Sequence, residues 1–256
     1  MDVPWAIRLI ALAMCAVILQ RMFGARRGKT YFIRRIPGID AIEESVGRAT
    51  EMGRPVLFSP GTAGLDNMQT LAGLAVLGWI ARRCVRMMVR IIVPIFEPVV
   101  LPAAADIVRD AYRAEGREEE FDPDDVRFLS KDQNAYAAGV IGILIREKVA
   151  AGFYFGPFGF ESLLIAETGR RVGAIQVAAT ADFFQIPFFI CACDYTLIGE
   201  ELYAASAYLT REPVQVGTLA GQDLAKLILI LLLVLGAIGA ALWPGALNPL
   251  EGLLGR

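Results

Sequence analysis

Two apolar segments lie near the two ends of this chain, and each is close to the length that a membrane crossing requires. Residues 3–19 are apolar except for Arg8, and residues 224–243 are apolar except for Lys226. A helix needs about 20 apolar residues to cross the ~30 Å hydrocarbon core of a bilayer. We therefore expect a transmembrane helix within residues 1–22, a second one within 221–243, and a water-soluble domain over 37–220 between them.

Basic residues follow the first apolar segment, and no acidic residue occurs among them before Asp40. Lysine and arginine next to a span mark its cytoplasmic side. The pattern predicts a protein of the bacterial inner (plasma) membrane, with both termini outside and the main domain in the cytoplasm. The same residues, most of them in a juxtamembrane segment over 23–36, can also bind anionic lipid head groups. They are Arg21, Arg26, Arg27, Lys29, Arg34 and Arg35.

Two other interpretations of the first segment are weaker. A cleaved signal peptide carries its positive charges before the apolar run, whereas here they follow it. A lipoprotein could use Cys15, but the bulky Met14 stands where a small residue is expected. Beyond the second span, residues 244–256 form a short outer tail. Its spaced leucines fit either a short helix on the outer leaflet or a frayed end.

The composition excludes several kinds of chemistry. The chain has no histidine, so a histidine general base, a Ser–His or Cys–His pair and a histidine metal site are all ruled out. A net charge of −2 gives no attraction to nucleic acid. Cys191 and Cys193 lie on an expected strand, but a zinc site would need a second such pair. We therefore predict no metal, no cofactor and no nucleic-acid partner.

Short apolar runs alternate with longer helical patterns through residues 37–220. Continuously apolar strands indicate a parallel sheet that helices cover on both faces. The fold class predicted is a doubly wound, mostly parallel α/β sheet of five or six strands. We expect strands at residues 55–58, 91–93, 126–129, 152–155, 174–178 and 188–192. We expect helices at 40–53, with Asp40 and Glu43 as a capping box, and at 66–83, 102–115, 132–148, 160–170 and 200–209.

In such a sheet, ligands bind beyond the carboxyl ends of the strands, where the strand order reverses. Two expected strand-to-helix loops contain glycines and could cradle an anion at a helix N-terminus. Their spacing matches neither known phosphate-loop motif, and helix capping by Asp66 is the plainer role for that residue. The candidate ligand-binding residues are Ser59, Gly61, Thr62, Gly64, Asp66, Asn67, Gly156, Gly159, Glu161, Ser162, Asp182 and Asp194.

The four acidic residues of this set are expected to converge at one edge of the sheet. Such a cluster could hold Mg²⁺ or perform acid–base chemistry. Aspartate is also common in these loops for turn geometry alone, and Glu161 suits a helix dipole without any other purpose. No catalytic residue can be named from the sequence.

The expected helix over 132–148 is apolar on most of its sides. A sheet covers only one side of such a helix, so a second partner is required. Small residues that would allow a close approach are Ala135, Ala138, Gly139 and Gly142. These residues predict a homo-oligomer interface, and deep burial within one chain is the alternative.

Three stretches resemble an uncharacterised family of prokaryotic membrane-anchored proteins. The stretches are 34–56, with its Arg-Arg-Ile-Pro-Gly-Ile-Asp start, Asp132–Gly139 and Cys193–Glu201. The resemblance covers most of the middle domain and implies no activity and no site residues.

Two hypotheses about function follow. The first is a cytoplasmic domain, anchored at the inner membrane, that self-associates into a scaffold with lipid and other membrane proteins as its partners. The second is a membrane-bound enzyme or sensor that binds a small anion or a nucleotide at the strand-end loops. The missing histidine and the apolar helix favour the first hypothesis.

Overall fold

A computed structural model describes residues 5–29, 37–210 and 213–242 of the chain. These residues form two compact units. One unit comprises residues 35–210, and the other brings together residues 1–34 and 211–256.

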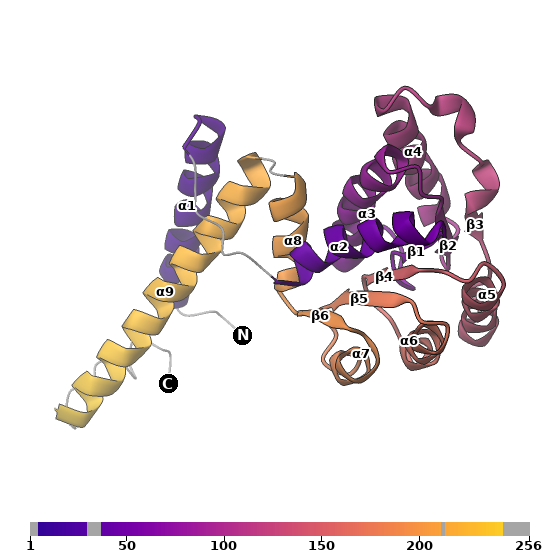
Figure 1. The fold of residues 1–256 in the computed structure, drawn as a ribbon. Coiled ribbons are helices and arrows are strands. Elements are labelled where there is room, and N and C mark those ends of the chain that lie inside the picture. The colour runs from indigo at the N-terminus through magenta and orange to yellow at the C-terminus, as the bar shows by residue number, and fades with distance from the viewer. Residues whose placement is uncertain (1–4, 30–36, 211–212, 243–256) are drawn as a thin grey trace. The chain divides into compact units, whose positions relative to one another are not determined.

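The larger unit is built on six parallel strands in the order β3-β2-β1-β4-β5-β6 (Figure 1). The chain adds β2 and β3 outward from β1, then returns to place β4 on the other side of β1. The strand order therefore reverses between β1 and β4, where Ser59 lies opposite Tyr154. The strands are β1 (Val56–Ser59), β2 (Ile91–Ile95), β3 (Val126–Phe128), β4 (Ala151–Phe155), β5 (Ile175–Thr180) and β6 (Tyr195–Ile198).

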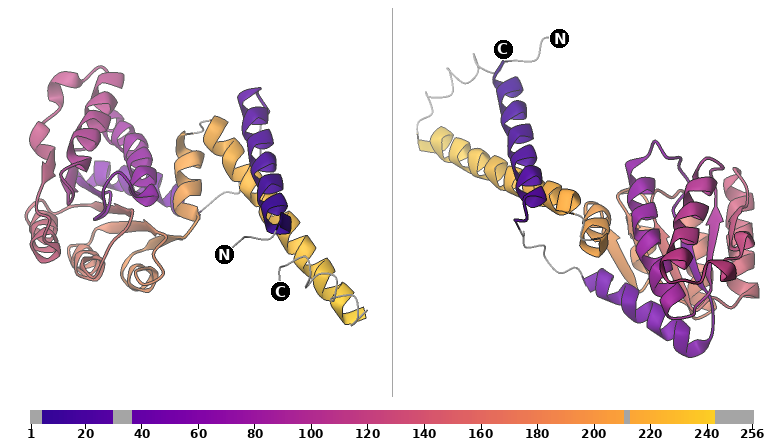
Figure 2. Two further views of the ribbon diagram at one scale, coloured as in Figure 1. Left: turned by 180° about the vertical axis from the view of Figure 1, so that it is seen from behind. Right: turned by 90° about the horizontal axis from the view of Figure 1, so that it is seen from above.

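Helices cover both faces of this sheet, as Figures 1 and 2 show. Side chains alternate along each strand, so Phe58 packs into the core on one face and Leu57 into the core on the other. Burial on both faces explains why the strands are continuously apolar. One layer is α2 (Pro37–Met52), α3 (Met68–Arg86), α4 (Val100–Ala114) and α8 (Glu201–Thr210), and the other is α5 (Gln133–Arg146), α6 (Glu161–Arg171) and α7 (Ile186–Ala192).

The predicted parallel α/β sheet is therefore confirmed, but two local predictions are wrong. The expected strand over 188–192 is helix α7, and the sixth strand follows it at Tyr195–Ile198. Ile186, Phe189 and Ala192 are buried at a spacing of three residues, which is a helical period rather than a strand period. The capping box at Asp40 is also wrong, because α2 already begins at Pro37 and Asp40 lies within its first turn.

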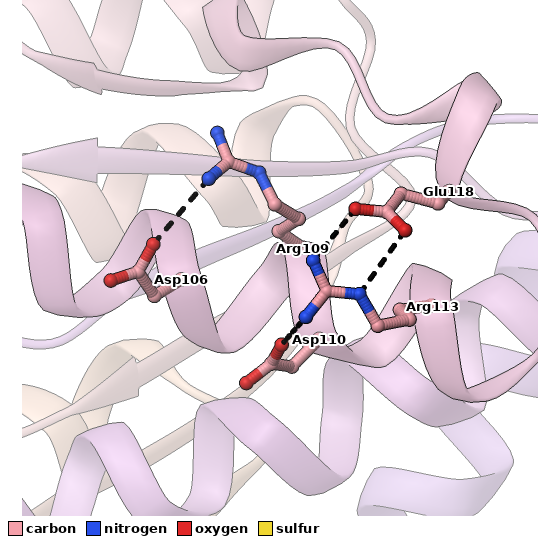
Figure 3. A network of polar contacts seen from close by, with 5 residues as sticks. All are labelled: Asp106, Arg109, Asp110, Arg113 and Glu118. Atoms are coloured by element: carbon pink, nitrogen blue, oxygen red, sulfur yellow. Dashed lines mark hydrogen bonds and ion pairs between the residues drawn. The ribbon is translucent and has the colours of Figure 1, made fainter.

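Salt bridges hold the acidic segment after α4 against that helix (Figure 3). Arg113 contacts Asp110 at 3.1 Å and Glu118, in the short helix η1 (Glu118–Glu120), at 2.8 Å. Arg109 contacts Asp106 at 3.6 Å. Exposed pairs of this kind contribute at most about 1 kcal/mol each. A second short helix, η2 (Pro123–Asp125), leads from this segment into β3.

The smaller unit is a pair of antiparallel helices, α1 (Trp5–Arg26) and α9 (Pro213–Leu242). Their backbones approach closely at two glycines of α9. A side chain at Gly217 would come within 2.8 Å of the Ala25 Cβ, and one at Gly221 within 2.8 Å of the Ile18 Cα. Glycines four residues apart are a common basis for helix packing in membranes.

One helix in the described part of the chain is long and apolar enough to cross a membrane. It is Val216–Ile238, within α9, with a mean hydropathy of 2.0. Its large apolar side chains are mostly exposed; Leu233 is 72% exposed. The first expected span is helical, as α1, but it is not counted among the helices long and apolar enough to cross a membrane. The structure therefore gives one candidate span where the sequence predicted two.

Candidate functional site

The two glycine-containing loops that the sequence singled out lie side by side. β1 and β4 are paired in the sheet, so the loop that begins at Pro60 and the loop that begins at Gly156 leave adjacent strands at the same edge. This edge is where the strand order reverses. In open α/β sheets, that position is the usual location of a ligand.

The two loops interlock through their backbones. The Thr62 amide donates a hydrogen bond of 2.8 Å to the Pro157 carbonyl oxygen. Gly61 (φ +92°) faces the same oxygen, and a Cβ at Gly61 would lie 2.4 Å from it. Gly156 (φ +146°) faces the Pro60 carbonyl, which would be 2.2 Å from a Cβ. The first glycine of each loop therefore makes room for the other loop rather than for a phosphate.

Beneath these loops, hydrogen bonds link the ends of β1 and β2 to helix α5. Ser59 Oγ and Tyr136 Oη are 2.8 Å apart, and Tyr136 Oη donates to the Pro94 carbonyl at 3.3 Å. Ser59 then donates to Tyr136 and accepts a weak bond from the Gly61 amide at 3.4 Å. Burial raises the pKa of Tyr136 well above its usual value, so the phenol stays protonated and donates.

Glu161 is the most unusual residue at this edge. It begins α6 and is completely buried. Its Oε1 accepts a 2.6 Å hydrogen bond from the Gly159 amide. Its Oε2 is buried and has no hydrogen-bond partner among the described residues. A buried carboxylate oxygen without a partner costs several kcal/mol, so native structures rarely keep one without a purpose.

Gln133 lies next to that free oxygen. A Cβ at Gly159 would be 2.7 Å from Glu161 Oε2 and 2.6 Å from Gln133 Nε2, so the two side chains flank the same point. Gln133 is partly exposed and begins α5.

Ser162 belongs to the same buried group. Its Oγ lies 2.8 Å from the Gly159 carbonyl and 2.6 Å from Gln185 Oε1. Because a hydroxyl has one proton, it donates to one of these oxygens at a time. The contact joins the first turn of α6 to the residue before α7.

Three other candidate residues have local structural roles. Asn67 caps α3 by accepting a 2.8 Å hydrogen bond from the Gln69 amide. Capping by Asp66 is therefore wrong, and Asp66 is instead exposed on the loop, with Oδ1 beside Gly64. Asp182 Oδ1 accepts from the Phe184 amide at 2.9 Å and shapes the turn after β5.

Asp194 lies at the opposite, amino-end edge of the sheet. It precedes β6, and its Oδ2 accepts a 2.8 Å hydrogen bond from the amide of Gln176, near the start of β5. It lines a cavity of about 290 Å³ together with Glu44, Arg48 and Tyr195. The four acidic residues therefore do not converge. Asp194 precedes strand β6 (Tyr195–Ile198), whereas the sequence predicted that it follows a strand over 188–192.

The loops at the carboxyl-end edge are acidic. Glu97 follows β2 and Asp132 follows β3, in addition to Asp66, Glu161 and Asp182. Lys131 is the one basic residue in these loops, and it pairs with Glu97 at 2.7 Å. No group of three potential metal ligands gathers within the described ranges. This charge disfavours an anionic ligand, which would meet carboxylates instead of arginines.

The predicted oligomer residues lie on two sides of α5. Ala135 and Ala138 are exposed, whereas Gly139 packs against Leu129 of the same chain. Gly142 lies under the Arg146 guanidinium. The sheet and α6 cover the rest of α5, so only a narrow strip of this helix is free for a partner.

The four cysteines are free thiols. Burial raises the pKa of Cys84 to about 12 and raises that of Cys193 further. These two thiols are therefore unreactive at neutral pH. Cys191 lies within helix α7, whereas the sequence predicted a strand there.

Sequence reasoning placed Gln133 at this edge without giving it a role, and it missed Tyr136. The available signal was a tyrosine inside an otherwise apolar helix, because a buried phenol needs a hydrogen-bond partner. Comparison with known proteins adds no residue roles. Residues 4–246 match a family described as a domain of unknown function, DUF6754. No curated protein and no solved structure matches the chain.

Proposed function

Because the chain belongs to the DUF6754 family, whose description assigns no activity, we propose its function from its own site. We propose a membrane-anchored α/β domain that binds a small molecule at the reversal of strand order between β1 and β4. The buried Glu161, with one oxygen unpaired, carries this proposal. Sites of function are where proteins retain such unfavourable groups.

The ligand is a neutral or cationic molecule that donates a hydrogen bond to Glu161. A carboxylate oxygen accepts hydrogen bonds, so an N–H or O–H group or a positive charge would satisfy the unpartnered Oε2. The surrounding acidic residues add to this preference. A free anion or a nucleotide, which the sequence suggested, fits these charges less well.

Anchoring is the second part of the proposal. The exposed apolar side chains of Val216–Ile238 call for a hydrocarbon environment. Helix α1 packs along this stretch through the two glycines of α9, so we propose that it crosses the bilayer too. Arg21, Arg26, Arg27 and Lys29 lie at its end and would mark the cytoplasmic side. Arg34 and Arg35 lie outside the described residues. We place the protein in the inner membrane with the α/β unit in the cytoplasm.

A thermal-shift screen of the full-length chain in detergent tests ligand binding. Spermidine represents cations, adenosine represents neutral donors, and ATP represents anions. A ligand present at 100 times its Kd adds about 2.7 kcal/mol of stability. We expect a shift of several degrees with a cation or a neutral donor, and none in the Glu161→Gln variant.

Glu167→Gln is the matched control. Glu167 lies on the same helix as Glu161 but is exposed and pairs with Arg171 at 3.1 Å. The control should respond to the ligand as the parent protein does. Equal responses in both variants, or no shift with any of the three probes, would rule out this site.

Self-association into a scaffold is the second candidate function. The exposed Ala135 and Ala138, together with Ile145 at 54% exposure, leave an apolar strip on α5 that favours it. Mass measurement of the chain in nanodiscs tests this idea. An oligomer that Ala138→Arg disperses would support it, and a monomer at all concentrations would exclude it.

A further inference from the structure

The carboxyl-end edge of the sheet carries a second feature, separate from Glu161. Phe183 and Phe184, in the turn between β5 and α7, are 84% and 83% exposed. Two adjacent phenylalanines exposed to this degree are unusual on a protein surface, because each would gain by leaving water.

Other exposed apolar side chains lie at the starts of α3 and α6, which are hydrogen-bonded to the segment that contains this turn. Met68 is 66% exposed, and Phe160 and Leu163 are also exposed. Two hydrogen bonds hold these elements together. The Gln69 side chain accepts from the Ala181 amide at 2.8 Å, and Ser162 contacts Gln185 at 2.6 Å. We name the set Met68, Phe160, Leu163, Phe183 and Phe184 the apolar edge surface.

Short segments connect this edge to the apolar ends of the chain. Helix α2 begins beside the carboxyl end of β6, where Gly38 lies against Leu197. Helix α8 also begins at that end of β6, one strand away from the Phe183–Phe184 turn. It ends at Thr210, and the candidate span begins at Val216. Six residues reach about 20 Å at most, so the chain itself limits the distance from Thr210 to the start of the candidate span.

We propose that the apolar edge surface inserts into the lipid interface, with the Phe183–Phe184 turn deepest. This inference rests on the proposed anchoring, which supplies the bilayer. Aromatic side chains favour the boundary between head groups and acyl chains. The nearby Asp182 gives no attraction to anionic lipid, so apolar contact drives the insertion. The surface is expected to behave alike in neutral and in anionic bilayers.

Fluorescence quenching in nanodiscs tests the proposal on the full-length chain. Phe183→Cys is labelled with an environment-sensitive dye, after Cys15, Cys191 and Cys193 have been replaced by alanine. Nanodiscs of phosphatidylcholine contain a spin-labelled phosphatidylcholine as the quencher. The control is Arg171→Cys, at the opposite end of α6, where the parent side chain is 76% exposed.

We expect about twofold more quenching at position 183 than at 171, since insertion to about 5–10 Å brings the dye to the spin labels. Replacing part of the lipid with phosphatidylglycerol should leave this ratio unchanged. Equal quenching at the two positions overturns the proposal. A blue-shifted dye at 183 without quenching also overturns it, in favour of coverage by a second copy of the chain.

A third label separates this inference from the anchoring on which it rests. Leu231→Cys lies within the candidate span, where the parent side chain is 54% exposed. Quenching at 231 without quenching at 183 refutes only the edge insertion. Absence of quenching at 231 refutes the anchor, and with it the proposed membrane function.

Discussion

The two edges of the sheet differ in whether a buried carboxylate has a charged partner. At the amino-end edge, Arg90 contacts the buried Asp125 at 2.6 Å and Glu147 at 3.2 Å. At the carboxyl-end edge, Glu161 is completely buried, and one of its oxygens has no partner in the described part of the chain. At Asp125 a cationic partner offsets part of the cost of burying the carboxylate, whereas the unpartnered Glu161 oxygen has no such compensation. The difference indicates that the carboxyl-end edge is shaped by something other than stability.

The largest expected effect concerns the interlocked loops of the carboxyl-end edge. Gly156→Ala places a methyl group 2.2 Å from the Pro60 carbonyl oxygen, in a backbone conformation that disfavours a side chain. We expect a loss of about 3 kcal/mol in the free energy of unfolding, measured by thermal melting. Gly173→Ala is the control: its φ is +77°, but nothing lies within 4 Å of the added methyl group. This substitution should cost only about 1 kcal/mol.

An equal loss of stability in the Gly156→Ala and Gly173→Ala variants would show that the Pro60 and Gly156 loops can move apart.

The second effect tests the paired edge. Arg90→Ala leaves Asp125 buried without its partner and should cost about 2 kcal/mol at neutral pH. Burial raises the pKa of Asp125 above its usual 3.8, and Arg90 opposes that rise. The folded state therefore loses stability as the pH rises above 3.8 and this group ionises. Without Arg90 the fall is steeper, so the deficit of the variant should be larger at pH 7 than at pH 4. A deficit independent of pH would mean that the pair is electrostatically unimportant.

The third effect concerns the hydrogen bonds beneath the loops. Tyr136→Phe removes the hydroxyl that joins Ser59 to the Pro94 carbonyl. Two buried groups then lose a partner, and we expect a loss of about 1.5 kcal/mol. Tyr203→Phe offers a comparison, because Tyr203 is only partly buried. A loss in Tyr136→Phe no greater than in this control would show that water replaces the phenol.

The smallest effect has the opposite sign. Glu161→Gln keeps an oxygen for the Gly159 amide and removes the buried charge. We expect a gain of about 1 kcal/mol, together with loss of ligand binding. Asp125→Asn, the same change at the paired edge, also removes the charged partner of Arg90 and should give no such gain. If both substitutions destabilise, Glu161 has a partner in solution and the contrast between the edges disappears.

The architecture could be predicted from the sequence because its signal is local. A strand such as Val56–Ser59 is apolar throughout and lies between helical patterns, and burial on both faces imposes that pattern. The prediction of a strand over 188–192 was wrong because phenylalanine and isoleucine favour strands. Pro187 was the signal for a helix, since proline suits the first turn of a helix. Because of that single error, Asp194 was expected at the carboxyl-end edge of the sheet, whereas it lies at the amino-end edge.

The site could be predicted only in part, since its chemistry depends on contacts between distant residues. The sequence predicted that the glycines of the two loops belong to the site. It did not show that glycine is required there because the two loops contact each other. Gly61 and Gly156 are 95 positions apart, and only the pairing of β1 with β4 brings their loops together. The unpaired oxygen of Glu161 is likewise a property of packing. Its first-turn position gave an adequate explanation that involved no burial.

The interlocked loops also determine how this rim of the molecule can respond to a ligand or change during evolution. Gly61 and Gly156 each leave space for a proline carbonyl of the opposite loop, so neither segment can lengthen, shorten or shift without the other. Related sequences should therefore alter both together. The first turn of α5, where Gln133 lies, is not part of this interlock. At this edge of the sheet, the two interlocked loops are therefore the elements that must change together.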